Sequence, residues 1–398
     1  MTEPVENFAT RAAHAGRAPL PESLSRPLTP PIYQSTVYAF ARLDDLDTLT
    51  PEAQSYTYYR YGTPTHAALE AAICALEGAE AAVAAASGLA VISAAVLALA
   101  AAGDTIVLDR HAYGGTYTLA TAELARLGIE PLLVDATDAA AVEQALTRAP
   151  RPKALLIEAL TNPTLRVADV PALCALGRRH GVPVLVDATF ASPALLRPLA
   201  YGASLVWHSV AKYLGGHSAA MGGLAAGEAA LVAAMHEKIV RFGGCQGAMD
   251  AWLTLLGLPT LPLRMAAHSR TGQAVAEFLA AHPAIEHVYY PGLASHPQHA
   301  LARALYPAGC GGMLAFDLRG GEDAVRQLVA RLRLVAFAPS LADVTTTITY
   351  PYVTSHHGLP EDVLRTLGVG TGLVRLSAGI EDPADVIADL AQALAPLD

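Results

Sequence analysis

Two charged residues in apolar surroundings are the first candidates for chemistry. Asp187 ends the apolar run PVLVD, and Lys212 lies three residues beyond the end of the next run, SLVWHS. A carboxylate or an amine at the end of a buried strand is costly to desolvate unless it has a partner. A desolvated lysine also loses its proton more easily and can then act as a nucleophile. The pair therefore indicates a site where an amine forms a covalent bond and a carboxylate faces a cationic group.

A cofactor that combines an aldehyde with a pyridine ring, pyridoxal 5′-phosphate, accounts for both residues. Lys212 would bind the aldehyde, and Asp187 would keep the ring nitrogen protonated, so that the ring can accept electrons. Each residue alone has a plainer explanation. Asp187 could cap a turn, and Lys212 could be a surface lysine whose stem covers apolar surface. The interpretation therefore depends on the residues that surround the pair.

Further polar residues follow the other apolar runs, at the edge of an open α/β sheet where ligands bind. Ser87, Gly88 and Leu89 would begin a helix whose free N–H groups suit a phosphate, although an ordinary turn is the alternative. Ser209 could add a hydroxyl to the phosphate site. Tyr113, in YGGT, could stack on a planar ring and transfer protons, or it could be a core tyrosine. The other residues at these strand ends are Arg110, His111, Glu158, Asn162, Thr189 and His208.

The elements that position these residues alternate between residues 63 and 250. Short apolar runs bounded by turn residues are separated by helical patterns that close on Gly78 and Gly181. This alternation predicts a doubly wound, mostly parallel α/β sheet. The runs are DTIVLD (104–109), EPLLVD (130–135), KALLIEA (153–159), PVLVDAT (183–189) and ASLVWHS (203–209).

The flanking segments have a different character. Residues 1–62 are rich in proline and predict an extended arm that contacts a neighbouring subunit. Residues 251–398 mix helical and strand patterns and predict a smaller C-terminal α+β domain. The stretch 81–102 carries no charge, but its alanines and Ser87-Gly88 favour a buried strand, a turn and a helix over a membrane span.

Composition excludes several classes of partner. The net charge is −10 and no Lys/Arg run occurs, which argues against nucleic acid and against an anionic membrane. The first residues are acidic, unlike a signal peptide. Four cysteines lack zinc or CxxC spacing, so we expect reduced thiols, no metal site and a cytoplasmic location. No GxGxxG loop supports a dinucleotide oxidoreductase.

The chain resembles the cystathionine/methionine-metabolism family of pyridoxal-phosphate enzymes, which includes cystathionine γ-lyase, cystathionine γ-synthase and methionine γ-lyase. The similarity runs from about residue 10 to residue 392. The segments that carry it are PPIYQST, YYRYGTPT, ALEGAEA, ASGLA, YGGTY, NPTLRVADV, VDATFASP, HSVAKYLGGHS, HPAIEHVYYPGLASHPQH and LVRLSAGIED.

The resemblance implies the fold known as pyridoxal-phosphate fold type I and a role for each candidate residue. Lys212 would carry the cofactor and transfer the α and β protons, and Asp187 would pair with the ring nitrogen. Tyr113 would stack on the ring and protonate the leaving group. Arg375 would bind the substrate carboxylate. The other cofactor-binding residues would be Ser87, Gly88, Leu89, Thr189 and Ser209, with Tyr58 and Arg60 from a neighbouring subunit, and Asn162 and Ser340 would bind substrate.

The resemblance also implies an activity and an assembly. The activity would be γ-elimination or γ-replacement on a γ-substituted amino acid. O-acetyl- or O-succinylhomoserine sulfhydrylase and methionine γ-lyase are alternatives, as is a non-catalytic relative. The assembly would be a homotetramer, a dimer of dimers with active sites at the dimer interface.

Five positions depart from the family pattern. Ala211 removes a threonine hydroxyl from the phosphate site, Leu256 replaces an arginine, and Ala219 replaces an aspartate. Thr345 stands where many members carry a glutamate linked to recognition of the distal part of the substrate, which weakens the case for cystathionine. Gly115 replaces the cysteine usual in methionine γ-lyases, which weakens the case for methionine. These departures favour an unusual γ-substituted substrate.

Overall fold

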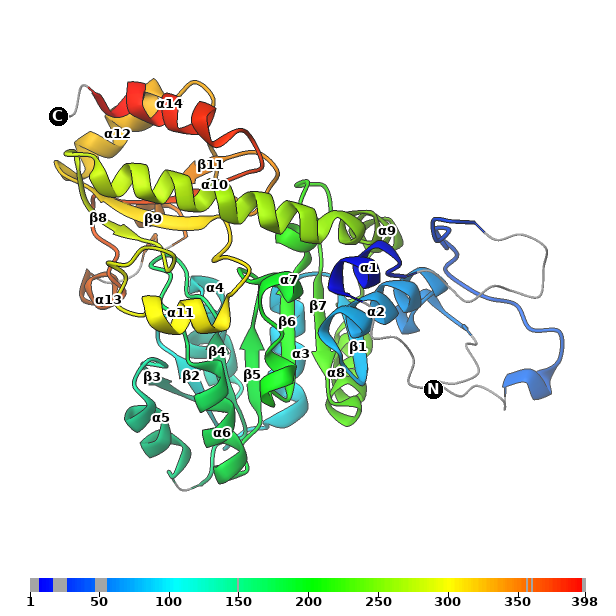
Figure 1. The fold of residues 1–398 in the computed structure, drawn as a ribbon. Coiled ribbons are helices and arrows are strands. Elements are labelled where there is room, and N and C mark those ends of the chain that lie inside the picture. Colours follow the sequence, from blue (N-terminus) through cyan, green and yellow to red (C-terminus); the bar gives the residue numbers. More distant parts are fainter. Residues whose placement is uncertain are drawn as a thin grey trace.

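The computed structural model describes residues 7–16, 27–46, 56–148, 150–355, 357–358 and 361–395. A large sheet with its helices forms one part, a second sheet lies beside it, and α10 (Leu261–Ala281) runs along the junction (Figure 1). The predicted arm, 1–62, falls partly outside the described residues. Its described part includes α1 (Phe8–Ala13), η1 (Leu43–Leu46) and η3 (Tyr59–Tyr61). Residues 30–33 are hydrogen-bonded to Thr65 and Trp252 of the body, and the chain beyond them extends away from it (Figure 1).

The large sheet has seven strands in the order β1-β7-β6-β5-β4-β2-β3. All its pairings are parallel except those of β7, which is antiparallel to β1 and β6. The mostly parallel sheet predicted from the sequence is therefore confirmed, and each of the five apolar runs forms a strand. The strands are β1 (Ala81–Ala85), β2 (Thr105–Asp109), β3 (Glu130–Val134), β4 (Leu155–Glu158), β5 (Val184–Asp187), β6 (Leu205–Ser209) and β7 (Gly223–Gly227).

Strand β7 was not predicted, because its sequence GLAAG lacks the β-branched residues typical of a buried strand. Its small residues have a packing reason. A Cβ at position 223 would lie 2.3 Å from the carbonyl oxygen of Ser87, so only glycine lets the strand approach the start of α3 (Gly88–Leu99). The strand thus supports the turn at which α3 begins.

Helices begin and end where capping residues stand. Thr63 accepts a hydrogen bond from the N–H of His66 at the start of α2 (Pro64–Glu77), and Asp169 does the same for Ala172 in α6 (Val170–His180). Both helices end at the predicted glycines. The alanine-rich stretch forms β1 and α3 as predicted, and no helix among the described residues is long and apolar enough to cross a membrane. The remaining helices of the large part are α4 (Gly114–Thr118), α5 (Ala139–Leu146), α7 (Ser192–Leu195) and α8 (Ala229–Phe242).

The second sheet has five strands in the order β10-β11-β12-β9-β8, paired antiparallel except for β10 and β11. Helices α10, α12 (Gly321–Arg331) and α14 (Pro383–Leu394) pack together beside it. The strands are β8 (Ile285–Tyr289), β9 (Met313–Leu318), β10 (Ala336–Phe337), β11 (Thr347–Thr349) and β12 (Leu373–Ser377), and the other helices are α9 (Ala248–Gly257), α11 (His299–Leu305) and α13 (Glu361–Thr366).

A buried arginine of α10 holds the turn that follows β6. Lys212 interrupts the short helix η6 (Val210–Leu214) with φ −110° and ψ −140°. Arg264 donates hydrogen bonds to the carbonyl oxygens of Tyr213 (2.7 Å), Leu214 (3.4 Å) and Gly257 (2.7 Å). The carbonyl groups of Tyr213 and Leu214 lie at the end of the interrupted helix, where helical donors are lost, whereas that of Gly257 also accepts from the Thr260 hydroxyl (3.2 Å). The long helix of the second part therefore fixes the backbone beside Lys212.

Replacing Arg264 should destabilise the protein. We expect Arg264→Leu to lower the free energy of unfolding by about 3 kcal/mol, because buried carbonyl groups lose charged donors. Urea unfolding followed by circular dichroism measures the change. Arg326→Leu is the matched control, since Arg326 forms an exposed pair with Glu322 within α12 and should leave the unfolding curve unchanged. Equal curves for the two variants would contradict the prediction.

Candidate functional site

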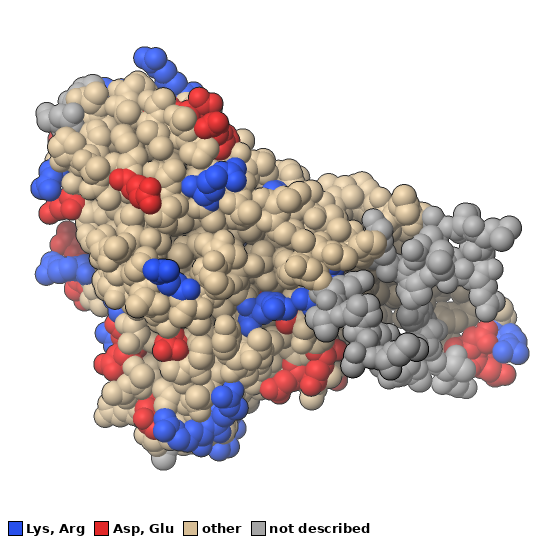
Figure 2. Space-filling model, in the orientation of Figure 1, with Lys and Arg blue, Asp and Glu red and all other residues tan. Residues whose placement is uncertain are grey.

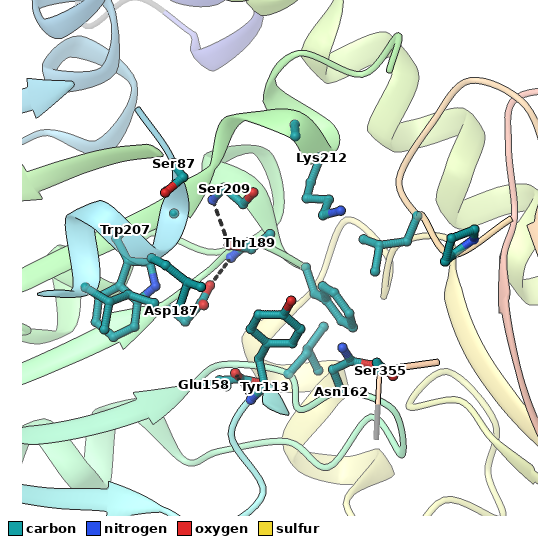
Figure 3. Close-up of a pocket in the computed structure, with 18 of the residues that line it drawn as sticks. Ser87, Tyr113, Glu158, Asn162, Asp187, Thr189, Trp207, Ser209, Lys212 and Ser355 are labelled. Atoms are coloured by element: carbon teal, nitrogen blue, oxygen red, sulfur yellow. Dashed lines mark hydrogen bonds between the residues drawn. The ribbon is translucent and has the colours of Figure 1, made fainter. Parts of the chain in front are cut away.

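A cavity of about 570 Å³ lies where the carboxyl ends of the large-sheet strands face the second part of the chain. The strand ends supply most of its polar residues, and the segment 339–355 and β12 close it (Figure 3). The structure brings ten of the predicted site residues together on its wall: Ser87, Gly88, Leu89, Tyr113, Asn162, Asp187, Thr189, Ser209, Lys212 and Arg375.

Lys212 points its amine into this cavity (Figure 3). Within the described residues the amine makes no hydrogen bond and no ion pair. Burial lowers the pKa of Lys212, and the positive charge of Arg375 lowers it further. A larger share of this amine is therefore neutral, and nucleophilic, than for an ordinary lysine.

Asp187, which is half-buried, and Glu158, which is buried, bring two carboxylates to neighbouring strand ends, paired in register across β5 and β4. Asp187 accepts a hydrogen bond from the N–H of Thr189 (2.8 Å), and Glu158 accepts one from the N–H of Tyr113 (2.5 Å). Burial raises the pKa of both carboxyl groups, and the charge of Asp187 adds to the rise at Glu158. Neither has a cationic partner in the described part of the chain. A protonated ring nitrogen beside Asp187 would supply the missing charge, so the residues fit a pyridine cofactor.

The first turn of α3 forms a second polar corner of the cavity. Ser87 caps the helix by accepting a hydrogen bond from the N–H of Ala90 (3.1 Å), which leaves the N–H groups of Gly88 and Leu89 without acceptors in the helix. A Cβ at position 88 would contact Ser209 at 3.4 Å, so the helix start and the end of β6 lie side by side. Free N–H groups at a helix start, next to a hydroxyl, suit a phosphate.

Arg375 is a buried cation that lacks an acidic partner among the described residues. Its side chain is 4% exposed and donates hydrogen bonds to Asn162 Oδ1 (3.0 Å) and to the carbonyl oxygen of Ser340 (3.2 Å). Burial lowers the pKa of Arg375 to about 10, which keeps the group protonated at neutral pH. Ser340 contributes its backbone and does not line the cavity. A buried guanidinium with only neutral partners favours an anionic ligand such as a carboxylate.

Tyr113 stands at the start of α4 with its ring beside Asn162 (Figure 3). A Cβ at position 115 would lie 2.5 Å from the ring edge of Tyr113. Gly115, one of the five departures, therefore makes room for the ring in this orientation. A cysteine at that position would push the ring aside.

Tyr58 and Arg60 are not brought to the cavity of their own chain. The Arg60 guanidinium lies over the rings of Tyr58 and Tyr61, 5.5 and 5.2 Å from their centroids, and donates to the carbonyl oxygen of Val240. The Tyr58 side chain is 40% exposed. Tyr58 and Arg60 therefore do not contribute to the cavity of the chain that carries them.

The other departures differ in their position relative to the cavity, and only Thr345 departs from the sequence expectation. Ala211 lines the cavity, as expected for the missing phosphate hydroxyl. Thr345 does not line it, and its hydroxyl donates instead to Asp343 (2.8 Å). Leu256 and Ala219 are exposed.

Several cavity residues were given no role by the sequence. Trp207 carried a signal, since strand alternation places it on the same side of β6 as Ser209. Glu158 stood at a strand end without an assigned task. The others lie in loops or among apolar residues, where the sequence does not show which side chains face a cavity: Ile92, Leu160, Phe190, Met221, Pro339, Leu341, Thr349, Thr354 and Ser355.

Comparison with known proteins gives one consistent result. A model of the family described as Cys/Met metabolism PLP-dependent enzyme matches residues 9–395, where PLP stands for pyridoxal phosphate. The chain is 40% identical to cystathionine gamma-lyase of Bacillus subtilis over 368 residues, 92% of this chain and 93% of the relative. It is 42% identical to cystathionine gamma-synthase of Mycobacterium tuberculosis over 393 residues, 97% and 96% of the two chains. The crystal structure of cystathionine gamma synthase from Xanthomonas oryzae pv. oryzae, in complex with aminoacrylate and cysteine, matches with TM-score 0.91 at 35% identity and covers 98% of both chains.

The lowered pKa of Lys212 can be tested by competitive labelling, because the chain has only three lysines, Lys153, Lys212 and Lys238. We expect acetic anhydride at neutral pH to acetylate Lys212 of the cofactor-free protein fastest, as measured by peptide mass spectrometry. Arg375→Met should slow that reaction, because removing the neighbouring charge raises the pKa of Lys212. The acetylation rates of the other two lysines serve as internal references, because they correct for differences in reagent concentration between the two proteins. An unchanged Lys212 rate in the variant would contradict the assignment.

Proposed function

The chain belongs to the Cys/Met metabolism family of PLP-dependent enzymes, and from this premise we propose that it uses PLP on Lys212 for γ-elimination or γ-replacement on a γ-substituted amino acid. The observation that carries the proposal is the convergence of Lys212, Asp187 and Arg375 on one cavity without counter-ions of their own among the described residues. One bound cofactor and one bound amino acid would supply those counter-charges.

Each part of the cofactor has a matching group in the cavity. The phosphate would be held by the N–H groups of Gly88 and Leu89 and by the hydroxyls of Ser87 and Ser209. Asp187 would pair with the ring nitrogen. When bound, the cofactor supplies an electron-accepting ring that stabilises negative charge at the substrate carbon atoms.

The chain's own residues would bind the substrate and transfer protons. Arg375, held by Asn162 and Ser340, would bind the α-carboxylate and orient the amino acid. Lys212, once displaced by the substrate amine, would take the α-proton, pass it on and then take a β-proton, whose removal allows the γ-substituent to leave. Its lowered pKa suits that task near neutral pH. Tyr113 would protonate the departing γ-substituent. Loss of that substituent followed by hydrolysis gives a 2-oxo acid and ammonia, whereas addition of a thiol gives a new thioether.

The cavity wall favours a γ-substituent without charge. Among the described residues, four charged side chains line the cavity: Glu158, Asp187, Lys212 and Arg375. The cofactor and the α-carboxylate account for all of them except Glu158, which is bound to the backbone of Tyr113. The remaining wall is apolar or carries hydroxyl groups. We therefore favour a short ester or thioether over a substrate with a charged distal end, such as cystathionine.

Two related activities remain alternatives, and each is judged by a specific observation. An O-acetylhomoserine sulfhydrylase agrees with the uncharged wall. An O-succinylhomoserine sulfhydrylase, such as the relative from Pseudomonas aeruginosa that is 38% identical, agrees with it less, because a succinyl ester ends in a carboxylate. A methionine γ-lyase also agrees with the wall but departs at Gly115. A non-catalytic relative is disfavoured, because Lys212, Asp187 and Arg375 are all present and converge on the cavity.

We further propose a homotetramer built from dimers, with Tyr58 and Arg60 reaching the phosphate site of the partner. The exposed face around α9 and α10 carries few charges (Figure 2). Apolar side chains are exposed there and on the arm, which is typical of a surface covered by another subunit. They are Leu28, Val37, Leu43, Phe242, Met249, Leu256 and Leu263. A cytoplasmic location is part of the proposal and agrees with four free cysteines.

The proposed function is tested by fixing the cofactor and by assaying a substrate panel. Borohydride reduction of the PLP-loaded protein should add the reduced cofactor to Lys212, as seen by peptide mass spectrometry, and Lys212→Ala should remove that modification. We expect 2-oxobutanoate to form from O-acetylhomoserine and methionine at least about tenfold faster than from O-succinylhomoserine and cystathionine, because a buried charge would lack a partner. Adding sulfide separates replacement from elimination. A preference for the charged substrates would contradict the uncharged γ-site, and absence of reduced cofactor on Lys212 would contradict the function.

Subunit complementation tests the role of the arm. Lys212→Ala and Arg60→Ala should each be strongly impaired alone. Hybrid dimers of the two variants would contain one site with both native residues, so equal mixing and reassembly should restore about a quarter of the sites in a two-fold dimer. Product formation after reassembly measures the gain, and reassembly of each variant with itself is the control. No gain in the mixture would show that Arg60 does not act in the partner's site.

A further inference from the structure

Trp207 lies directly beside the carboxylate at the centre of the proposed site. Asp187 on β5 and Trp207 on β6 are partners in the parallel register, so their side chains project from the same side of the sheet. Trp207 lines the cavity although its side chain is only 2% exposed. The indole nitrogen faces the Asp187 carboxylate (Figure 3).

The indole N–H of Trp207 is a buried donor that forms no geometrically complete hydrogen bond with any described residue, although it lies close enough to the Asp187 carboxylate to lower the pKa of that group. Buried N–H groups are normally paired, and an unpaired one at a ligand cavity needs an explanation. The polar group that the N–H faces is the carboxylate of Asp187, which already accepts the N–H of Thr189. A second donor on the same carboxylate would fix its plane as well as its position.

A second hydrogen-bond donor would help to keep the Asp187 carboxylate ionised. Burial raises the pKa of Asp187, which favours the neutral acid. The hydrogen bonds of Thr189, the electrostatic interaction with His208 and, as a smaller contribution, the indole N–H of Trp207 all lower the pKa of Asp187. A neutral Asp187 could not balance the charge of a protonated ring nitrogen, so donors that keep it ionised also preserve cofactor binding.

We propose that Trp207 is a positioning residue for Asp187: its indole N–H donates to the carboxylate and holds it ionised and oriented toward the cofactor ring. This inference rests on the proposed function, in which Asp187 meets the ring nitrogen. A purely structural role is the competing explanation, because Trp207 also packs in an apolar cluster with Leu185, Leu205 and Ala225. The two explanations make different demands on the indole N–H. A positioning role requires this donor, whereas a packing role in the core requires only the volume of the ring.

Replacing the N–H while keeping the ring separates the two explanations. The chain has two tryptophans, Trp207 and Trp252, and the second donates to the carbonyl oxygen of Pro30 outside the cavity. In a Trp252→Phe background, biosynthetic incorporation of 3-benzothienylalanine would replace Trp207 alone with a ring of nearly equal shape that has no N–H. Trp207→Phe is the second variant, which also removes volume.

Cofactor affinity and its pH dependence are the readouts. We expect both variants to bind PLP about tenfold more weakly at neutral pH, in line with the loss of a hydrogen bond to a charged group. The acid limb of PLP affinity should move to higher pH, because Asp187 without its second donor protonates more easily. Equilibrium dialysis across a pH series measures both effects. Thermal unfolding of the cofactor-free proteins reports any structural loss separately.

The outcomes are distinguishable. If the benzothienyl protein keeps the affinity and acid limb of its Trp252→Phe parent, the N–H has no role and the inference is wrong. If the Phe variant alone is weakened and its melting temperature falls in parallel, Trp207 only fills the core, and the inference is again wrong. If the Trp252→Phe protein, with Trp207 intact, binds no PLP at Lys212, the proposed function itself is wrong, and the inference that rests on it is wrong as well.

Tryptophan fluorescence gives an independent measurement of how close the bound cofactor lies to the natural Trp207 side chain. In the Trp252→Phe protein, Trp207 is the only indole, and PLP binding should quench most of its emission because the ring lies at the cavity wall. In Trp207→Phe, the emission of Trp252 should change less. Equal quenching in the two proteins would place the cofactor away from Trp207 and overturn the inference.

Discussion

The structure depends on charged groups that are withdrawn from water and have no counter-ions among the described residues. Lys212, Asp187 and Arg375 sit at one cavity, and none has an oppositely charged partner among the described residues. Such an arrangement is unfavourable by itself, because desolvation is not offset by an ion pair. It becomes favourable when a ligand brings a cation to the carboxylate and anions to the helix start and the guanidinium. The site is thus preorganised for a small molecule with separated charges. Until such a molecule binds, the uncompensated charges lower the stability of the folded protein.

The surrounding structure keeps those groups in place with neutral donors and acceptors. Arg375 is held by an amide and a backbone carbonyl, and Asp187 by the backbone of Thr189. Neutral partners fix direction without cancelling charge, which leaves the charge available to a ligand. The same logic explains why Glu158 is attached to the backbone of Tyr113, since a second free carboxylate would compete with Asp187 for the cation.

Much of the large sheet could be predicted, because strands buried on both faces are continuous apolar runs and glycines mark the helix ends. The residues at strand ends followed from that prediction, and the structure gathers them around one cavity. Strand β7 was missed, since close packing selected small residues that carry no strand signal. Trp207 was missed although strand alternation places it on the same side of β6 as Ser209, which was predicted to lie in the site. Ser340 was named from the resemblance alone, because its contact with Arg375 is made by its backbone carbonyl, and a backbone contact leaves no mark on residue type.

The hydrogen bonds from Arg264 to the turn after Lys212 have a mechanical consequence. Helix α10 packs against β8, β9 and α14, so it belongs to the body of the second sheet. That body cannot rotate away from the large sheet without either breaking the bonds to Tyr213 and Leu214 or pulling the backbone next to Lys212 along with it. A hinge that opened the cavity for exchange of small molecules would therefore also displace the nucleophile, and closing the cavity would return it to its working position.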